Sequence, residues 1–388
     1  MPLYDKYDSL GLSSDKQPIV IDIGTAYTKV GFSAETSPRA ILPTQVVDPE
    51  TKQCRRLDAS ARPSDLYEFL VDFVHHLCFK HLLVSPKDRK FIVVESLLCP
   101  TSFRETLAKV LFRHFEVFSV MFAPSHLVSL CCLGLDTALV LDVGHKESVL
   151  IPVYQGYPVL HAWQAEPLAG HAVQSSLSSL LKAALGNGGD ASLAVVEDLP
   201  REVVEDIKVR ACFVTRLDRA QQMEEGRDPA PPPDASYREG SVPGFVIPGS
   251  VRERAYEVLF QQDNDEVAVP TMVLDAIVKC PIDMRRPLAE NILVIGGTSM
   301  ALGFKARLQS ELKHLVQTSK YASKLAVRTF KFHTPPAKEN YVAWLGGALF
   351  GGTDILNLRS LTKEVYLKKS EVPDWTSLEY NCRDEKTM

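Results

Sequence analysis

Two aspartates stand at the ends of apolar runs, and each is followed two residues later by a glycine. The stretches are IVIDIGTAYTKVGFS at Ile19–Ser33 and LVLDVGHKESVLIPV at Leu139–Val153, and each continues through a short turn into a second alternating strand. Such a turn directs backbone N–H groups at a phosphate, while its aspartate reaches a phosphate-bound cation or the water around it. We therefore expect Asp22 and Asp142 to act on a metal ion through water. Two such turns facing each other would bind one nucleotide between them.

A third element completes the pattern. ILVIGGTSM, at Ile292–Met300, reads as a strand, a Gly-Gly pair and the start of a helix-compatible stretch. Glycines at that point let the backbone approach a flat ligand such as a nucleoside. A lone Asp-x-Gly is usually just a strand-ending turn, but repetition of the whole strand–turn–strand unit indicates two related lobes with a cleft between them.

This duplicated plan resembles the superfamily of actin, sugar kinases and chaperone ATPases. PRAILP at Pro38–Pro43, IPVYQGYPVLHA at Ile151–Ala162, and later IVKCPIDMRRPLAENILVIGGTSMALGF and YVAWLGGALFGG follow in the order found in actin. From about residue 19 to about residue 356 the chain is similar to the actin family. The resemblance implies an α/β, actin-like duplicated two-lobe fold with a central nucleotide cleft.

The lobe boundaries also follow from the resemblance. Residues 1–133 and 342–388 are expected to form the first lobe, with a reduced small subdomain at about 44–63. Residues 134–341 are expected to form the second lobe, with an inserted subdomain at about 169–264.

The resemblance implies a site for ATP or ADP with Mg²⁺. The residues that match the family's binding motifs are Asp22, Gly24, Thr25, Lys29, Asp142, Gly144, Gly170, Lys208, Gly296, Gly297 and Thr298. Lys29 is expected to act as a point charge on a phosphate.

Several positions depart from actin. His145-Lys146-Glu147 stands where actin has Asp-Gly-Val, which removes a carboxylate from the cation shell and places a side chain where backbone approaches phosphate. Lys146 could instead supply a compensating positive charge. Ser125 replaces the glutamine that orients the attacking water, and Ser is too short for that task. Val209 replaces a ribose-contacting glutamate, and Asn340 replaces a lysine near the base.

We therefore expect nucleotide to be bound weakly or without hydrolysis, or not at all if the fold has been kept without its ligand. We expect no catalytic residues and no enzyme activity. The alternative is a nucleotide-hydrolysing enzyme or a small-molecule kinase of the same superfamily.

The stretch from His81 to Val120, together with APSHLVSL and HTPPAKENYVAWLGGALFG, resembles the actin-related proteins at the pointed end of dynactin. In actin, the segment matching Thr44–Pro63 is a full subdomain whose loop enters the next subunit, and here there is room for about one hairpin. The resemblance thus implies a cytoplasmic, cytoskeletal dynactin subunit that caps a filament, does not self-polymerise, and serves dynein and cargo adaptors indirectly. A nuclear subunit of a chromatin complex is a further alternative, but we find no basic nuclear-localisation run.

Composition sets limits on these readings. The chain has 388 residues, of which 45% are hydrophobic, and a formal net charge of −5. This length is sufficient for two lobes, and the negative net charge does not favour binding to nucleic acid. We find no signal peptide and no apolar run that would span a bilayer, and expect a soluble intracellular protein. The eight cysteines lack paired C-x-x-C spacing, so we expect reduced core thiols, as in cytosol.

Some local expectations can also be tested. A helix is predicted over Asp65–Leu82, and because adjacent helical histidines point about 100° apart, we expect no zinc site at His75, His76 and His81. A strand is predicted at Phe91–Ser96, and a helix opened by a Ser102/Glu105 capping box is predicted to run to about Phe115. A helical stretch is predicted over Arg201–Leu217.

Three further segments are expected to lie at the surface. The proline-rich stretch Gly226–Gly244 is predicted to be a mobile loop rather than a peptide ligand. Met1–Lys16 is expected to be loose. In the tail from about Lys368 to Met388, Trp375 is expected to anchor a partner or to pack on its own lobe.

Overall fold

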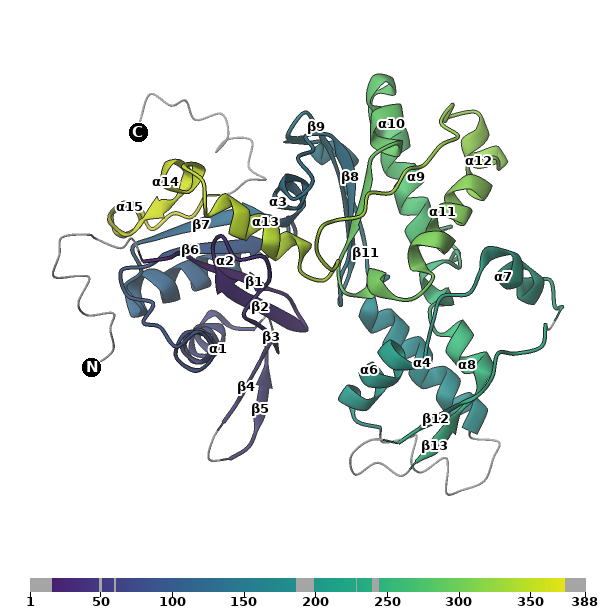
Figure 1. Ribbon diagram of the computed structural model, residues 1–388, viewed down its shortest axis with the longest axis horizontal. Helices are drawn as coiled ribbons and strands as arrows, with labels where there is room; N and C mark the ends of the chain where they lie inside the picture. The colour runs from purple at the N-terminus through teal and green to yellow at the C-terminus, as the bar shows by residue number, and fades with distance from the viewer. Residues whose placement is uncertain are drawn as a thin grey trace. The chain divides into compact units, whose positions relative to one another are not determined.

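The computed structural model describes residues 16–48, 51–58, 61–185, 199–227, 229–238 and 244–373. By contacts, the chain divides into two compact units, one of residues 1–132 with 343–388 and one of residues 133–342. Each unit is built around a mixed sheet with helices packed on it (Figure 1). The expectations for the N-terminal segment before Lys16 and for Trp375 lie outside the described residues.

The first unit contains a six-stranded sheet in the order β15-β7-β6-β1-β2-β3. Its strands are β1 Ile19–Ile23, β2 Tyr27–Phe32, β3 Ala40–Pro43, β6 Lys90–Glu95, β7 Ser119–Pro124 and β15 Leu361–Thr362. β1, β6 and β7 run parallel, while β2, β3 and β15 are antiparallel to their neighbours. A separate hairpin, β4 Gln45–Val47 with β5 Cys54–Arg56, follows β3 and projects from this unit (Figure 1).

Helices cover both faces of this sheet because its central strands are apolar on both sides. The helices are α1 Pro63–His75, the π-helix η3 His76–Leu82, α2 Thr101–Lys109, the π-helix η4 Val110–His114, α3 Ser125–Cys131, α13 Val342–Phe350, α14 Ile355–Arg359 and α15 Lys363–Lys369. Ile19, Ile21 and Phe91 join the core formed with α1 and α2. Alternate residues such as Val20 face α13, where Trp344 Nε1 donates to the Val20 carbonyl at 3.1 Å.

The second unit contains a sheet in the order β10-β9-β8-β14, with β11 also paired to β9. Its strands are β8 Ala138–Val143, β9 Ser148–Tyr154, β10 Tyr157–Pro158, β11 Gln164–Glu166 and β14 Ile292–Ile295. A second small sheet pairs β12 Ala235–Tyr237 with β13 Phe245–Ile247.

Helices of the second unit enclose one large apolar core. They are α4 Gly170–Leu185, α6 Arg201–Arg210, α7 Leu217–Glu224, α8 Gly249–Arg254, α9 Val269–Lys279, α10 Ile282–Ala289, α11 Phe304–Leu315 and α12 Ser319–Ala322. Three 3₁₀ turns, η5 Leu160–Ala162, η6 Glu257–Leu259 and η7 Thr298–Met300, complete the described helical elements.

The repeat seen in the sequence is also a repeat of strand pairing. In the first unit Asp22 lies opposite Lys29 of the antiparallel partner and opposite Val94 of the parallel one. In the second unit Asp142 lies opposite Val149 and opposite Ile295 in the same way. Each aspartate therefore sits near the end of a strand that is flanked by one antiparallel and one parallel neighbour.

Two local predictions about helices are wrong in detail. The helix predicted from Ser102 has Pro100 at its N-cap and no side-chain capping bond, so the capping box is absent; Pro100 already fixes the entry of the chain. The stretch predicted as helical to Leu217 breaks after Arg210 and restarts as α7. The strand predicted at Phe91–Ser96 is confirmed as β6, and the helix predicted over Asp65–Leu82 is present, although its last turns are a π-helix.

The described part of the proline-rich stretch makes specific contacts with α7 and α8, and its mobility stays a prediction. Arg219 Nη2 donates to the Ala230 carbonyl at 2.7 Å, and the Gly249 N–H donates to Asp234 Oδ1 at 2.8 Å. A Cβ on Gly249 would lie 1.7 Å from the Pro232 carbonyl oxygen. The described part therefore packs against the start of α8.

Cysteine placement departs in part from the expected core thiols. All the described cysteines are free, but Cys54 and Cys131 are exposed and three others are buried, namely Cys78, Cys212 and Cys280. Burial raises the pKa of Cys78 and of Cys212 to about 12, so both remain thiols at neutral pH. No helix among the described residues is long and apolar enough to cross a membrane.

Candidate functional site

The first Asp-x-Gly turn joins β1 to β2 and is closed by its glycine. The Gly24 N–H donates to the Tyr27 carbonyl at 3.2 Å, and a Cβ on Gly24 would lie 2.7 Å from that oxygen. Glycine is therefore required for the backbone to fold back so tightly. Lys29 Nζ lies 3.0 Å from Asp22 Oδ2, and both side chains are largely buried. The ammonium predicted to meet a phosphate is thus already paired with the aspartate, while Thr25 is exposed beside it.

The second turn joins β8 to β9 with the same closure. The Gly144 N–H donates to the Glu147 carbonyl at 3.2 Å, three residues on, as in the first turn. A Cβ on Gly144 would lie 3.2 Å from that oxygen. The two turns therefore share a backbone hydrogen bond as well as a sequence pattern.

A threonine from a distant segment caps each turn in the same manner. Thr44 Oγ1 donates to the Gly24 carbonyl at 2.7 Å, and Thr298 Oγ1 donates to the Gly144 carbonyl at 2.6 Å. Thr298 was predicted as a site residue, but Thr44 was not, because no local pattern links it to the turn twenty residues earlier. These bonds occupy the glycine carbonyl oxygens, which helps to hold each turn in one conformation.

The predicted glycines of the second unit gather around Gly144. The Gly170 N–H, at the start of α4, donates to the Gly144 carbonyl at 3.1 Å. Gly296 has φ +94°, and a Cβ there would lie 2.3 Å from the Val143 carbonyl and 2.5 Å from Asp142 Oδ1. At Gly296 neighbouring backbone occupies the space of a side chain, whereas a Cβ on Gly170 would lie 2.8 Å from the Thr298 hydroxyl. The structure thus brings Asp142, Gly144, Gly170, Gly296 and Thr298 together.

Asn340 was predicted as a departure from actin, and it carries an unexpected feature. Its Oδ1 is the one buried side-chain nitrogen or oxygen without a hydrogen-bond partner among the described residues. A Cβ on Gly297 would lie 3.8 Å from the Asn340 Cβ, and the Gly296 N–H donates to the neighbouring Glu339 carbonyl at 2.9 Å. A buried acceptor without a donor costs free energy, so this oxygen requires a hydrogen-bond donor from outside the chain, either a water or a ligand.

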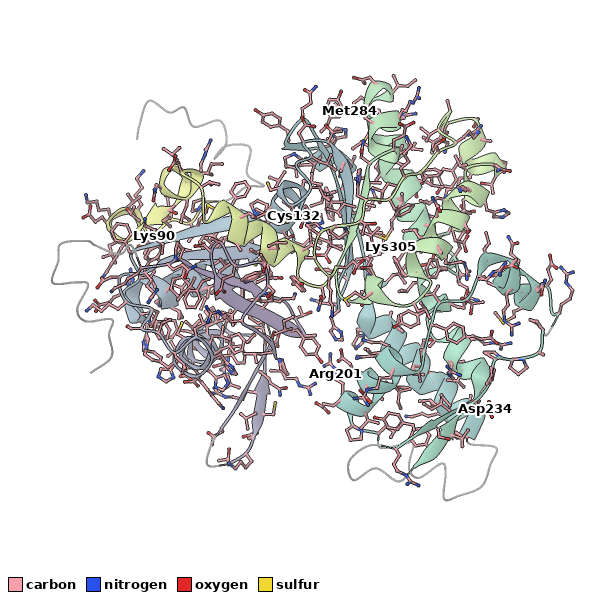
Figure 2. All side chains as sticks on the ribbon, viewed as in Figure 1. Lys90, Cys132, Arg201, Asp234, Met284 and Lys305 are labelled. Atoms are coloured by element: carbon pink, nitrogen blue, oxygen red, sulfur yellow. The ribbon has the colours of Figure 1, made fainter. Side chains whose placement is uncertain are left out.

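The segment that carries Asn340 is fixed by an ion pair. Lys305 Nζ, at the start of α11 and labelled in Figure 2, lies 2.5 Å from Glu339 Oε1. Burial alone would raise the pKa of Glu339, but the hydrogen bond and positive charge of Lys305, together with a hydrogen bond from the backbone, outweigh burial and lower that pKa. Glu339 therefore stays ionised and keeps Asn340 in place.

His145 is in contact with an arginine from a distant helix. Its Nε2 accepts a hydrogen bond from Arg201 Nη2 at the first turn of α6 (Arg201 is labelled in Figure 2). The His145 ring also meets the His171 ring edge-to-face, with centroids 6.0 Å apart. Since guanidinium only donates, His145 Nε2 must be an unprotonated acceptor here. Arg201 was missed by the sequence analysis, because 56 residues separate it from His145.

Lys208 of α6 lies within electrostatic reach of Arg201, the residue that contacts His145. Its buried ammonium lies 3.7 Å from Glu205 Oε1, while Glu205 Oε2 accepts from Gln174 Nε2 at 3.2 Å. Burial lowers the pKa of Lys208, and Glu205 partly restores it. Val209, beside it, is 68% exposed, so an apolar side chain stands in water where actin has a glutamate.

Ser125 is buried at the start of α3 in the first unit. Its hydroxyl lies 3.1 Å from Nδ1 of the buried His126, and its carbonyl accepts from Ser129 Oγ. A serine side chain is shorter than the glutamine of actin and lacks the reach to hold a water on a phosphate.

A directly bound metal ion has little support. Among the described residues no three His, Cys, Asp or Glu side chains gather as a ligand group. Asp22 is engaged by Lys29, and Asp142 lies against Gly296. A cation held through water by these aspartates therefore stays a prediction.

Comparison with known proteins is consistent with this geometry. A family model described as Actin matches residues 13–72 and 65–371. Actin-related protein 10 of Dictyostelium discoideum is 28% identical over 433 aligned residues, covering 94% of this chain and 90% of the relative. The matched residues include both turns, the Gly-Gly element and α13.

Proposed function

Because the chain belongs to the actin family, we propose that it is a structural subunit of dynactin. In this role it caps the pointed end of dynactin's actin-like filament in the cytoplasm and supports dynein-driven transport along microtubules. Its partners are the filament's end subunit and the other pointed-end proteins, with dynein and cargo adaptors contacted indirectly. The match to an actin-related protein over nearly the whole chain supports this proposal.

The observation that carries the capping proposal is the small hairpin between β3 and α1. Where actin has a full subdomain with an inserting loop, this chain has β4 and β5 of three residues each. Arg55 Nη2 of the hairpin lies 2.5 Å from Asp72 Oδ2 of α1, an ion pair at the surface. A hairpin of this size gives the next subunit little to bind, so elongation beyond this subunit is disfavoured.

Electron microscopy of dynactin carrying a gold-labelled subunit tests the capping role. We expect one label per filament, at the pointed end. Label along the filament or at its barbed end would refute the assignment. Co-purification of the tagged chain followed by mass spectrometry provides the matching control, because a chromatin partner set would favour the nuclear alternative.

We further propose that the second unit binds ATP or ADP, with Mg²⁺ held through water, and hydrolyses it hardly at all. The unpartnered Asn340 Oδ1 beside Gly297 supports a bound group that donates a hydrogen bond, such as the amine of a nucleobase. The short side chain of Ser125 supports weak hydrolysis. Steady turnover above about 1 per second would instead favour the enzyme alternative.

Replacing Asn340 tests the nucleotide proposal. Asn340→Leu removes the acceptor at similar volume, and we expect nucleotide affinity to fall roughly 5- to 150-fold, from a loss of about 1–3 kcal/mol. Isothermal titration with ADP measures this. Asn357→Leu, at an exposed position in the first unit, is the matched control and should leave affinity unchanged. Equal affinity in all three proteins, or no nucleotide in the wild type, would favour a fold kept without its ligand.

A further inference from the structure

Two imidazoles lie in contact on the first unit, where α1 passes into the π-helix η3. His76 Nε2 and His81 Nε2 are 3.1 Å apart and form a hydrogen bond, which a bound metal ion would replace, and the ring centroids are 4.9 Å apart. Both residues are half-buried at the surface. Their neighbour His75 is exposed and instead packs on Phe79, with ring centroids 4.6 Å apart. The close pair is therefore a specific feature of positions 76 and 81.

The π-helix explains why this pair forms. In an α-helix, residues five apart point about 140° away from each other. The wider turn of a π-helix, with its i to i+5 bonding, moves them toward the same side. The buried residues Leu77, Cys78 and Leu82 hold η3 against the core, and Leu83 ends it in a left-handed conformation, with φ 56°. The backbone thus sets the imidazole pair, which the expectation of an ordinary helix did not foresee.

We propose that His76 and His81 form a two-histidine chelate for a transition-metal cation of the Zn²⁺, Cu²⁺ or Ni²⁺ class. Two imidazole nitrogens that each bind one such ion at about 2.0–2.1 Å lie roughly 2.9–3.4 Å apart, and the observed separation is 3.1 Å. These cations favour imidazole, whereas Mg²⁺ and Ca²⁺ require oxygen ligands. The site is separate from the proposed nucleotide and capping functions.

The residues around His76 and His81 determine how tightly a metal ion would be held. Because no third His, Cys, Asp or Glu of the described residues completes a ligand group, water fills the remaining coordination positions. The nearby Lys80 repels a cation, but its side chain is exposed and its charge is screened. The metal should therefore bind and exchange readily.

Zn²⁺ titration of the full-length chain by calorimetry tests the proposal. We expect one equivalent to bind, with the affinity reduced at least about tenfold in His76→Gln and equally in His81→Gln, because a chelate's second ligand binds at a high effective concentration. His75→Gln is the matched control and should bind like the wild type. Circular dichroism checks that each variant keeps its fold.

Cu²⁺ resonance spectroscopy of the wild-type chain gives a test that needs no variant. One equivalent should show two imidazole nitrogens as ligands. One nitrogen, no Zn²⁺ uptake, or equal affinity in all variants would overturn the proposal. Loss of binding in His171→Gln would also overturn it, because it would place the metal on the other close pair, His145 and His171.

Discussion

At the scale of single residues, the two turns differ at the position after the glycine, which is the exposed Thr25 in the first turn and His145 in the second. His145 meets Arg201. A carboxylate at position 145 would meet the same guanidinium and form an ion pair with it. Because His145 stands where actin has an aspartate, this turn carries less negative charge than the turn of actin. It also lacks the carboxylate that would contact the water shell of a cation.

The double change His145→Asp with Lys146→Gly is expected to tighten Mg²⁺-nucleotide binding. It restores a carboxylate for the cation shell and removes a side chain where backbone approaches phosphate. Titration with ADP, with and without Mg²⁺, measures the gain, which should require the metal. The single changes show which residue is responsible. Weaker binding in Lys146→Gly would mean that Lys146 is itself a phosphate ligand.

At the scale of elements, α3 and α13 approach each other through a glycine. A Cβ on Gly346 would lie 2.0 Å from the Val128 carbonyl oxygen and 2.4 Å from its carbon. Both atoms belong to the backbone of α3, the helix that also carries Ser125. Backbone atoms cannot move away by a rotamer change, as side-chain atoms can. The contact fixes the position of α3 on α13 in the first unit.

Gly346→Ala is therefore expected to destabilise the protein. The helices must separate to admit one methyl group, at a cost of about 1–3 kcal/mol. The midpoint of urea unfolding should fall accordingly. Gly352→Ala is the matched control, since its Cβ would meet Leu349 O at an ordinary 3.4 Å. Equal midpoints for the two variants would show that the helices are not in tight contact.

At the scale of the whole molecule, each unit repeats one arrangement on a different set of helices. An Asp-x-Gly hairpin is flanked by a parallel strand and capped by a threonine from outside the hairpin, Thr44 in one unit and Thr298 in the other. The hairpin β4–β5 is an addition of the first unit that has no described counterpart in the same place of the second. The proposed capping role depends on this addition and not on the repeat.

The isolated chain is expected not to polymerise in salt and Mg²⁺ that polymerise actin. The short hairpin β4–β5 offers no long loop to a following subunit. Light scattering, with actin run in parallel as the control, measures the outcome. Filaments of the pure chain under the electron microscope would contradict the prediction and remove the basis for capping.

The sequence by itself determined the elements that depend on short-range physics. Alternating apolar residues specify β1, β2, β8 and β9, and glycines specify the turns between them, because both effects act over a few bonds. The repetition of these units predicted the actin-like two-lobe fold, and the match to the actin family model confirms that fold. The glycines that were predicted to lie near a ligand do gather in the second unit, at Gly144, Gly170 and Gly296.

The tertiary structure alone decided which distant residues meet. Neither the contact of Arg201 with His145 nor the unpartnered oxygen of Asn340 is visible in a local pattern, because each depends on how separate segments pack. The pairing of His76 with His81 required a π-helix, which differs from an α-helix by a small change in backbone winding that core packing selects. Local sequence preferences are too weak to fix such a change, so it is the burial of Leu77, Cys78 and Leu82 in the folded unit that places the two imidazoles side by side.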